Sequence, residues 1–332
     1  MDISFFLKKI DFESGVTVSV NHLCRCLDDE NIKYEIIYYE NDEDLYEKAI
    51  QCTSKCINLQ VPSFGDEVLK KILKVKDNVV ISIHSTLCNL QVEEGSLGRL
   101  LEMGNSDYQN LRFTCPAQCE CDGLNALVKR EYLYLPNTFS YPCDDIVIAE
   151  KTKEKRTLNR TLKISLVCAY RPLKNMITQV AAVIMLAKEY DLELHLFDSN
   201  FQSPVYKDIL AMAKYNNLKI VMHPQMKNFD CFQEIADFDL GLQVSLSETF
   251  SYVAFEHMIQ GIPVVGSDSV RFSSEIVTYS DVNEICRGMK KILENDDIYE
   301  KYRKEARIKA LEVQKQNNKD AVNTIRKMIC CP

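Results

Sequence analysis

Short runs of apolar residues alternate with longer amphipathic segments along most of the chain. The short runs are rich in β-branched and aromatic residues, which is typical of buried strands. They cover Ile3–Leu7, Lys33–Tyr39, Cys56–Val61, Val79–His84, Leu111–Cys115 and Tyr132–Leu135 in the first half, and Leu162–Cys168, Leu192–Phe197, Leu218–Met222, Leu240–Val244 and Pro263–Val265 in the second. Because strands and helices alternate, the pattern predicts an α/β fold with parallel sheets covered by helices on both faces.

The segments between these runs have the spacing of helices. Val16–Leu27 and Glu67–Leu73 are two examples in the first half. In Leu173–Tyr190, apolar residues recur every three or four positions, which predicts one buried stripe of Leu173, Ile177, Val180, Ile184 and Ala187. The charged segment Asp296–Met328 predicts a terminal helix or pair of helices, with no strand after it.

A polar, basic run at 151–160 separates two halves with the same rhythm. We therefore expect a Rossmann-like domain at 1–150, a solvated linker at 151–160 and a second Rossmann-like domain at 161–332 that ends in helices. The length of 332 residues suits two domains, and a hydrophobic content of 46% is enough for two cores.

Composition excludes several classes of protein. The net charge of −8 argues against a nucleic-acid partner. No apolar stretch approaches the ~20 residues of a membrane helix, and Met1–Leu7 lacks the basic start of a secretory signal. We therefore expect a cytoplasmic protein whose fourteen cysteines are free thiols. The cluster at Cys115–Cys121 matches no zinc-binding spacing.

Two cations follow the first strand of the second half. Arg171 and Lys174 lie where that strand leads into a helix, and ligands of parallel sheets bind at such carboxyl ends. Two cations with backbone N–H groups behind them suit a diphosphate. The alternative is a pair of solvated surface cations.

Two carboxylates, Glu248 and Glu256, follow the strand Leu240–Val244. Ser247 or Ser251 is a plausible helix N-cap between the strand and Glu256. If most of this span is helical, the carboxylates lie ~12 Å apart, and the helix N-terminus faces a phosphate between them. The alternative is a capping acid and a second acid that pairs with a buried neighbour.

These residues resemble the donor signature of retaining GT-B glycosyltransferases of family 4. The resemblance covers Ser247–Met258 and Gly261–Val265, with Ile235–Leu240 before them. Arg171 and Lys174 fall where that family has its phosphate-binding cations. The other matching segments are Phe12–Val16 for the glycine loop, His84 for the sugar-contacting histidine and Tyr132–Asn137 for the end of the first domain. Thr249 and Ser251 replace glycines that are usual in the family.

The resemblance implies a GT-B fold, in which two Rossmann-like domains face a central cleft. It implies transfer of a hexose from a GDP- or UDP-linked donor, such as GDP-mannose or UDP-glucose, to a glycan or other hydroxyl acceptor with retention of configuration. The first domain is the acceptor side and the second holds the donor. No metal or further cofactor is implied.

The resemblance also implies a role for each site residue. Arg171 and Lys174 bind the diphosphate, Glu248 binds the transferred sugar, and His84 steadies the reacting centre. Glu256 accepts the ribose hydroxyls. The remaining donor-binding residues are Gly15, Thr249, Phe250 and Ser251.

Other assignments remain open at the level of sequence. The tripeptide Asp42–Asp44 matches the D-x-D metal motif of another glycosyltransferase fold, but it starts a helical segment, where acidic residues serve as caps. The same scaffold also suits a sugar-nucleotide epimerase, or an inactive protein that binds a carbohydrate or a partner. If the chain is a divergent viral member, its location is the host cytoplasm.

Overall fold

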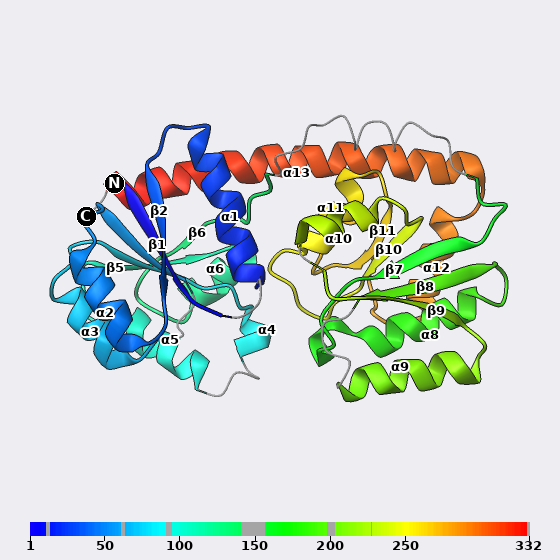
Figure 1. Cartoon of the computed structure of the whole chain (residues 1–332), viewed down its shortest axis with the longest axis horizontal. Helices are drawn as coiled ribbons and strands as arrows, with labels where there is room; N and C mark the ends of the chain where they lie inside the picture. The colour runs from blue at the N-terminus through cyan, green and yellow to red at the C-terminus, as the bar shows by residue number, and fades with distance from the viewer. Residues whose placement is uncertain are drawn as a thin grey trace. The chain divides into compact units, whose positions relative to one another are not determined.

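The computed structural model describes residues 1–10, 14–60, 64–90, 95–140, 157–197, 203–226 and 228–330 of the chain. The chain divides into two compact units, Met1–Tyr141 with Gln314–Pro332, and Pro142–Val313 (Figure 1). Each unit has its own parallel sheet and its own hydrophobic core.

The first unit is built on a six-stranded parallel sheet in the order β2-β1-β3-β4-β5-β6. Its strands are β1 (Ile3–Lys8), β2 (Tyr34–Tyr39), β3 (Cys56–Gln60), β4 (Val79–Ser82), β5 (Leu111–Cys115) and β6 (Tyr132–Tyr134). Its helices include α1 (Gly15–Asp28), α2 (Asp42–Gln51), α3 (Asp66–Leu73), α4 (Leu87–Leu90), α5 (Ser96–Gly104) and α6 (Gln118–Asn125). Successive side chains of a strand point to opposite faces, so Phe5 packs in the cluster that contains α1, and Phe6 packs in the cluster that contains α2 and α3.

The last helix of the chain, α13 (Asp296–Cys330), supplies part of this first core. Ala321, Val322, Ile325 and Met328 are buried beside β1 and α1 residues. The carbonyl of Met328 accepts from Asn78 Nδ2 at 2.7 Å and from Arg112 Nη2 at 2.5 Å. The sequence pattern had assigned all of 161–332 to the second domain, and the packing of the end of α13 differs from that assignment.

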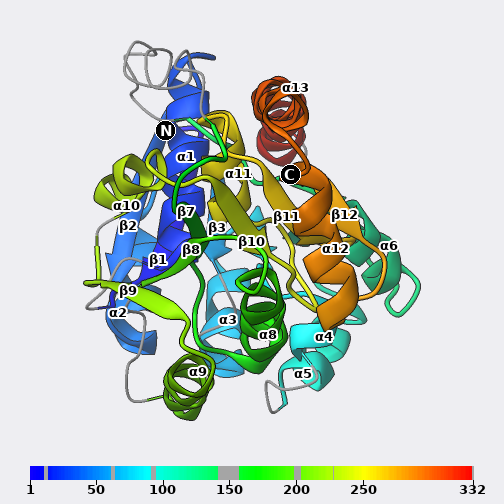
Figure 2. The same cartoon turned by 90° about the vertical axis from the view of Figure 1, so that its right-hand side faces the viewer.

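The second unit has a six-stranded parallel sheet in the order β12-β11-β10-β7-β8-β9 (Figure 2). Its strands are β7 (Leu162–Leu166), β8 (Leu192–Phe197), β9 (Lys219–His223), β10 (Leu240–Gln243), β11 (Val264–Ser267) and β12 (Glu275–Val277). Its helices include α8 (Met176–Leu186), α9 (Pro204–Tyr215), α10 (Asn228–Ile235), α11 (Tyr252–Ile259), α12 (Val282–Ile292) and the start of α13. Helices α8, α9 and α12 lie on one face of the sheet, and α10 and α11 lie on the other (Figure 1). No described helix is both long and apolar enough to cross a membrane.

The eleven strands expected from the sequence are all present, with ends that differ by a few residues. The short strand β12 was not predicted. The stripe predicted for α8 is partly confirmed, because Val180 is buried and Ile184 and Ala187 pack against the core. It is wrong at Ile177, which is 37% exposed, and the buried face also carries Met176, Gln179 and Val183. This helix begins only at Met176, and both α9 and α12 pack against it.

The expected linker falls mainly outside the described residues, which resume at 157. Its last residue, Arg160, was expected to be solvated. Instead, its guanidinium is ion-paired with Asp239, whose side chain is fully buried at the start of β10. The backbone N–H of Lys163 donates to the other carboxylate oxygen of Asp239 at 2.8 Å. Arg160 is therefore part of the second unit.

Candidate functional site

The loop after β7 carries the two cations that the sequence singled out. Pro172–Lys174 form a single 3-10 turn, and Asn175 then takes a left-handed conformation with φ 52° before α8 begins. Asparagine tolerates this conformation better than most residues. Arg171 precedes the turn with an extended backbone and an exposed side chain. Within the described ranges, its guanidinium makes no hydrogen bond or ion pair, so it is available to a ligand.

Lys174 is ion-paired with Glu248. Its Nζ lies 2.6 Å from Oε1 and 2.8 Å from Oε2 of the Glu248 carboxylate. Both side chains are largely shielded, at 22% exposed for Lys174 and 13% for Glu248. The structure therefore brings together the predicted phosphate cation and the predicted sugar-binding carboxylate, which come from the ends of β7 and β10.

Helix α11 starts later than the sequence analysis assumed. It begins at Tyr252, and Ser251 is its N-cap, with Oγ accepting from Ala254 N at 3.3 Å. Ser251 was one of two predicted caps and is confirmed. Glu248 lies four residues before Tyr252 and outside the helix, so the helical part of the span from Glu248 to Glu256 is Tyr252–Glu256. The loop between β10 and α11 ends at Ser251, whose backbone is extended, with ψ 97°.

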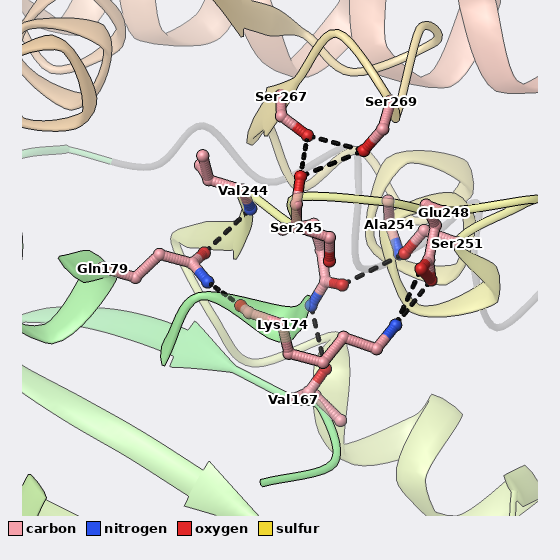
Figure 3. A network of polar contacts seen from close by, with 11 residues as sticks. Val167, Lys174, Gln179, Val244, Ser245, Glu248, Ser251, Ala254, Ser267 and Ser269 are labelled. Carbon is pink, nitrogen blue, oxygen red and sulfur yellow. Dashed lines mark hydrogen bonds and ion pairs between the residues drawn. The ribbon is translucent and has the colours of Figure 1, made fainter. Parts of the chain in front are cut away.

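Two buried glutamines, which the sequence analysis missed, connect these loops. Gln179 on α8 accepts from Val244 N at 2.9 Å and donates to the Lys174 carbonyl at 2.8 Å (Figure 3). Gln243 on β10 donates to the Val167 carbonyl at 2.8 Å and accepts from Ser251 Oγ at 3.1 Å. A sequence signal existed for Gln179, since it shares the helical spacing of the buried residues of α8.

Serine hydroxyls from β11 and the loop after it bind the start of the loop that carries Glu248. The Ser245 carbonyl accepts from Ser267 Oγ at 2.5 Å and from Ser269 Oγ at 3.0 Å (Figure 3). Ser267 ends β11, so this loop is tied to the next strand of the sheet. In addition, Leu246 N donates to the Leu173 carbonyl at 2.8 Å. The backbone around Glu248 is therefore fixed from two sides.

Thr249 and Phe250 continue the loop toward α11. Thr249 is half-buried. The ring of Phe250 lies 5.0 Å from that of Tyr252 and 5.1 Å from that of Phe272, centroid to centroid. This half-buried aromatic group packs beside the start of α11 and restricts the loop further.

Glu256 and His257 lie on the buried part of α11. Glu256 is 2% exposed, and His257 is fully buried. Burial lowers the pKa of His257 to about 4, and its Nε2 pairs with Ser165 Oγ on β7. Gly241 makes room for this ring, because a Cβ there would lie 2.7 Å from His257 Cδ2. A neutral histidine thus anchors α11 on the sheet next to Glu256.

His84 follows β4 in the first unit. Its Nε2 lies 2.7 Å from Gln60 Oε1, and Gln60 in turn donates to Asn58. Burial lowers the pKa of His84 to about 4. The ring lines a small pocket near the carboxyl ends of the strands, together with polar residues such as Ser19 and Asn137 and apolar ones such as Val20 and Leu135. His84 is therefore a neutral imidazole in a pocket with both polar and apolar lining.

Gly15 is the first residue of α1. Ser14 caps the helix by accepting from Thr17 N at 3.1 Å. A Cβ on Gly15 would meet no atom within 4 Å, so open space lies beside it. The rest of the expected glycine loop, 11–13, lies outside the described residues. Gly15 and His84 belong to the first unit, whereas the other candidate residues belong to the second.

No protein-family model and no curated protein matches the chain. Solved structures, in contrast, match nearly all of it. Sucrose-phosphate synthase from Thermosynechococcus elongatus has a TM-score of 0.70 at 14% identity, over 99% of both chains. HepE of Anabaena, in complex with UDP and glucose, has a TM-score of 0.72 at 14% identity, over 98% of this chain and 99% of that one. WaaG, a glycosyltransferase involved in lipopolysaccharide biosynthesis, has a TM-score of 0.67 at 12% identity, over 97% and 99%.

The chain has the GT-B fold. The sequence-based prediction of this fold class is thus confirmed, including its two parallel sheets with flanking helices. In GT-B terms, the Lys174–Glu248 pair and Arg171 lie at the carboxyl ends of the strands of the second Rossmann-like unit. This is the general location of ligand sites in parallel sheets.

The tripeptide Asp42–Asp44 forms the first turn of α2. Asp42 Oδ2 accepts from Gly65 N at 2.9 Å, and Asp44 pairs with Lys48 at 2.9 Å. Acidic residues in a first turn also suit the helix dipole. In the part of the chain that the structure describes, no group of three or more His, Cys, Asp or Glu side chains is placed to hold a metal ion. The cysteines at 115, 119 and 121 are free thiols.

Proposed function

We propose that this protein is a glycosyltransferase that moves a hexose from a nucleoside-diphosphate sugar to a glycan or other hydroxyl acceptor. The observation that carries the proposal is the Lys174–Glu248 ion pair beside the exposed Arg171, at the carboxyl ends of β7 and β10. Two cations suit a diphosphate, and an adjacent carboxylate suits sugar hydroxyls. The structures of HepE with UDP and glucose, and of the E. coli trehalose-6-phosphate protein with UDP-2-fluoro glucose, favour a UDP-linked over a GDP-linked donor.

In the proposed reaction, negative charge develops on the leaving diphosphate. Arg171, Lys174 and the N-terminus of α11 stabilise that charge, which is the largest contribution such a site supplies. Glu248 accepts hydrogen bonds from the transferred sugar, and Glu256 accepts those of the ribose. The loop residues Thr249, Phe250 and Ser251 shape the donor site.

We assign roles to two residues of the first unit as well: His84, as a neutral imidazole, steadies the reacting centre, and Gly15 is a donor-binding residue. Following the resemblance to family 4, the reaction retains the anomeric configuration and uses no metal, because the two cations neutralise the diphosphate.

A panel of nucleotide sugars tests the proposal directly. A ligand that binds only the native state raises the melting temperature by mass action, so UDP-hexoses should raise it at concentrations far above Kd, with chelator present. Donor hydrolysis or transfer should accompany the shift. If no nucleoside-diphosphate sugar shifts the melting temperature, the GT-B scaffold binds another partner. Turnover of a donor without any acceptor into an epimeric sugar nucleotide would instead identify an epimerase.

The two glutamates should differ in which part of the donor they affect. Glu256→Gln should weaken binding of the free nucleoside diphosphate roughly tenfold or more, because a hydrogen bond to a charged group is worth about 1.5–3 kcal/mol. Glu248→Gln should leave that affinity nearly unchanged and reduce transfer. Titration calorimetry with nucleoside diphosphate measures both. Equal losses in the two variants would contradict this division of roles.

Substitution of His84 should reduce transfer, but protonation of His84 should not affect the rate near neutral pH. Since burial lowers its pKa from 6.5 to about 4, the imidazole stays neutral across the neutral range. His84→Gln should therefore lower kcat/KM by the same factor at every pH from about 5.5 to 8. A limb of the wild-type profile near pH 6.5 that the variant abolishes would refute this. Because the unfolded state takes up the proton first, folding stability should fall as the pH drops from 6.5 toward 4.

A further inference from the structure

Gln179 uses both ends of its side-chain amide inside the protein. It is 1% exposed and lies in the first part of α8. Its Oε1 accepts from Val244 N at 2.9 Å, and its Nε2 donates to the Lys174 carbonyl at 2.8 Å and to the Asn175 carbonyl at 3.4 Å. The amide therefore connects the end of β10 with the turn that carries Lys174 (Figure 3).

This connection needs an uncharged amide. The Val244 N–H requires an acceptor, and the Lys174 carbonyl requires a donor, and the planar amide of Gln179 provides both. A carboxylate would place an oxygen against the carbonyl oxygen of Lys174. An apolar side chain would leave both buried backbone groups without their partner, at the cost of their desolvation.

The same two loops carry the ion pair of the candidate site. Val244 leads into the segment with Glu248, and the carbonyl that Gln179 holds belongs to Lys174 itself. The two loops are also joined directly through their backbones, because Leu246 N donates to the Leu173 carbonyl at 2.8 Å. Gln179 therefore helps to determine where the Lys174 ammonium and the Glu248 carboxylate stand.

We propose that Gln179 is a positioning residue of the donor site, which acts by fixing the backbone of Lys174 relative to the loop of Glu248. This inference rests on the proposed function and adds to it a residue that touches no substrate. A displacement of about 1 Å in a reacting group reduces rate by on the order of a hundredfold, so a positioning residue has a measurable effect on the reaction.

The test is a double-mutant cycle between Gln179→Met and Lys174→Met. Gln179→Met keeps the volume and removes all three hydrogen bonds of the amide. It should lower kcat/KM roughly tenfold to a hundredfold. If Gln179 acts through Lys174, its substitution should cost little more in the Lys174→Met background, so the two effects are not additive. Nucleoside-diphosphate affinity, measured by calorimetry, should follow the same non-additive pattern.

Val183→Ala is the matched control. Val183 is fully buried on the same helix and packs in the core of the second unit. This variant should lower thermal stability and leave kcat/KM within about twofold, because a stability loss alone does not move the site. A similar loss of kcat/KM in Val183→Ala would show that Gln179 has only a structural role.

Several outcomes would overturn the inference. One is a Gln179→Met variant with unchanged kcat/KM, and another is a loss that multiplies fully with that of Lys174→Met. If Gln179→Met does not fold, Gln179→Glu serves instead, since it keeps the acceptor for Val244 and loses the donor to Lys174. If Lys174→Met leaves nucleoside-diphosphate affinity unchanged, the proposed function fails together with this inference. If Lys174→Met weakens binding and both Gln179 variants do not, only the inference fails.

Discussion

Replacing Arg160 with alanine should lower the free energy of unfolding of the second unit by about 3 kcal/mol. Removing one partner of a buried ion pair costs about 3–5 kcal/mol, because it leaves a buried charge without compensation. The lower end applies here, since the Arg160 side chain is 37% exposed while the Asp239 side chain is 0% exposed. The Lys163 N–H remains as a donor to Asp239. Urea unfolding at neutral pH measures the change.

An exposed arginine on α12 provides the control for this prediction. Arg287 pairs with Glu284 on the same helix, and its side chain is 69% exposed. Arg287→Ala should cost no more than about 1 kcal/mol, as is usual for surface ion pairs. Asp239→Asn should restore part of the stability of Arg160→Ala, because it removes the negative charge that Arg160 balances. Equal losses of unfolding free energy in Arg160→Ala and Arg287→Ala would mean that the Arg160–Asp239 ion pair stabilises the fold no more than a surface ion pair does.

Lys174→Met should weaken binding of free nucleoside diphosphate roughly a hundredfold. It removes a charge-assisted hydrogen bond worth about 1.5–3 kcal/mol, and it leaves the Glu248 carboxylate uncompensated next to the diphosphate. Titration calorimetry at low and high salt measures the loss. The repulsion from Glu248 should persist at high salt, because the carboxylate is only 13% exposed and weakly screened.

A second substitution separates these two contributions. In the Lys174→Met background, Glu248→Gln should recover about tenfold in affinity, because it removes the negative charge. The same Glu248→Gln change alone should leave affinity for nucleoside diphosphate nearly unchanged. A double variant that binds no better than Lys174→Met would show that the ion pair does not couple the two residues in binding.

The strands and the fold class were predictable because buried parallel strands give continuous apolar runs. The run Val79–Ile81, for example, is wholly apolar and lies between the polar residues Asn78 and Ser82. The strand β12 escaped prediction because Glu275–Val277 is too short to show any periodicity. The N-cap at Ser251 was predictable from local chemistry, because a serine just before an apolar helical run can accept from the helix N–H groups.

The geometry of the site was less predictable than its residues. Helix α11 begins after its N-cap Ser251, so Glu248 lies outside the helix. The position of Ser251 depends on a distant residue, because its hydroxyl donates to Gln243 on β10. The Lys174–Glu248 pair joins residues 74 positions apart, so no local pattern contains it. Likewise, a single glutamine in an apolar segment gives no sign that both ends of its amide are used, as they are in Gln179.

The packing of α13 has a consequence for the order in which the protein folds during synthesis. Residues 1–141 leave the ribosome first, and domains generally begin to fold as they emerge. The core around β1 and α1 nevertheless includes Ala321, Val322, Ile325 and Met328. Its apolar surface therefore stays uncovered until the whole of 142–313 has been made. The nascent first unit is a natural client for a chaperone throughout that interval, and a fragment that ends at 141 would expose the same surface permanently.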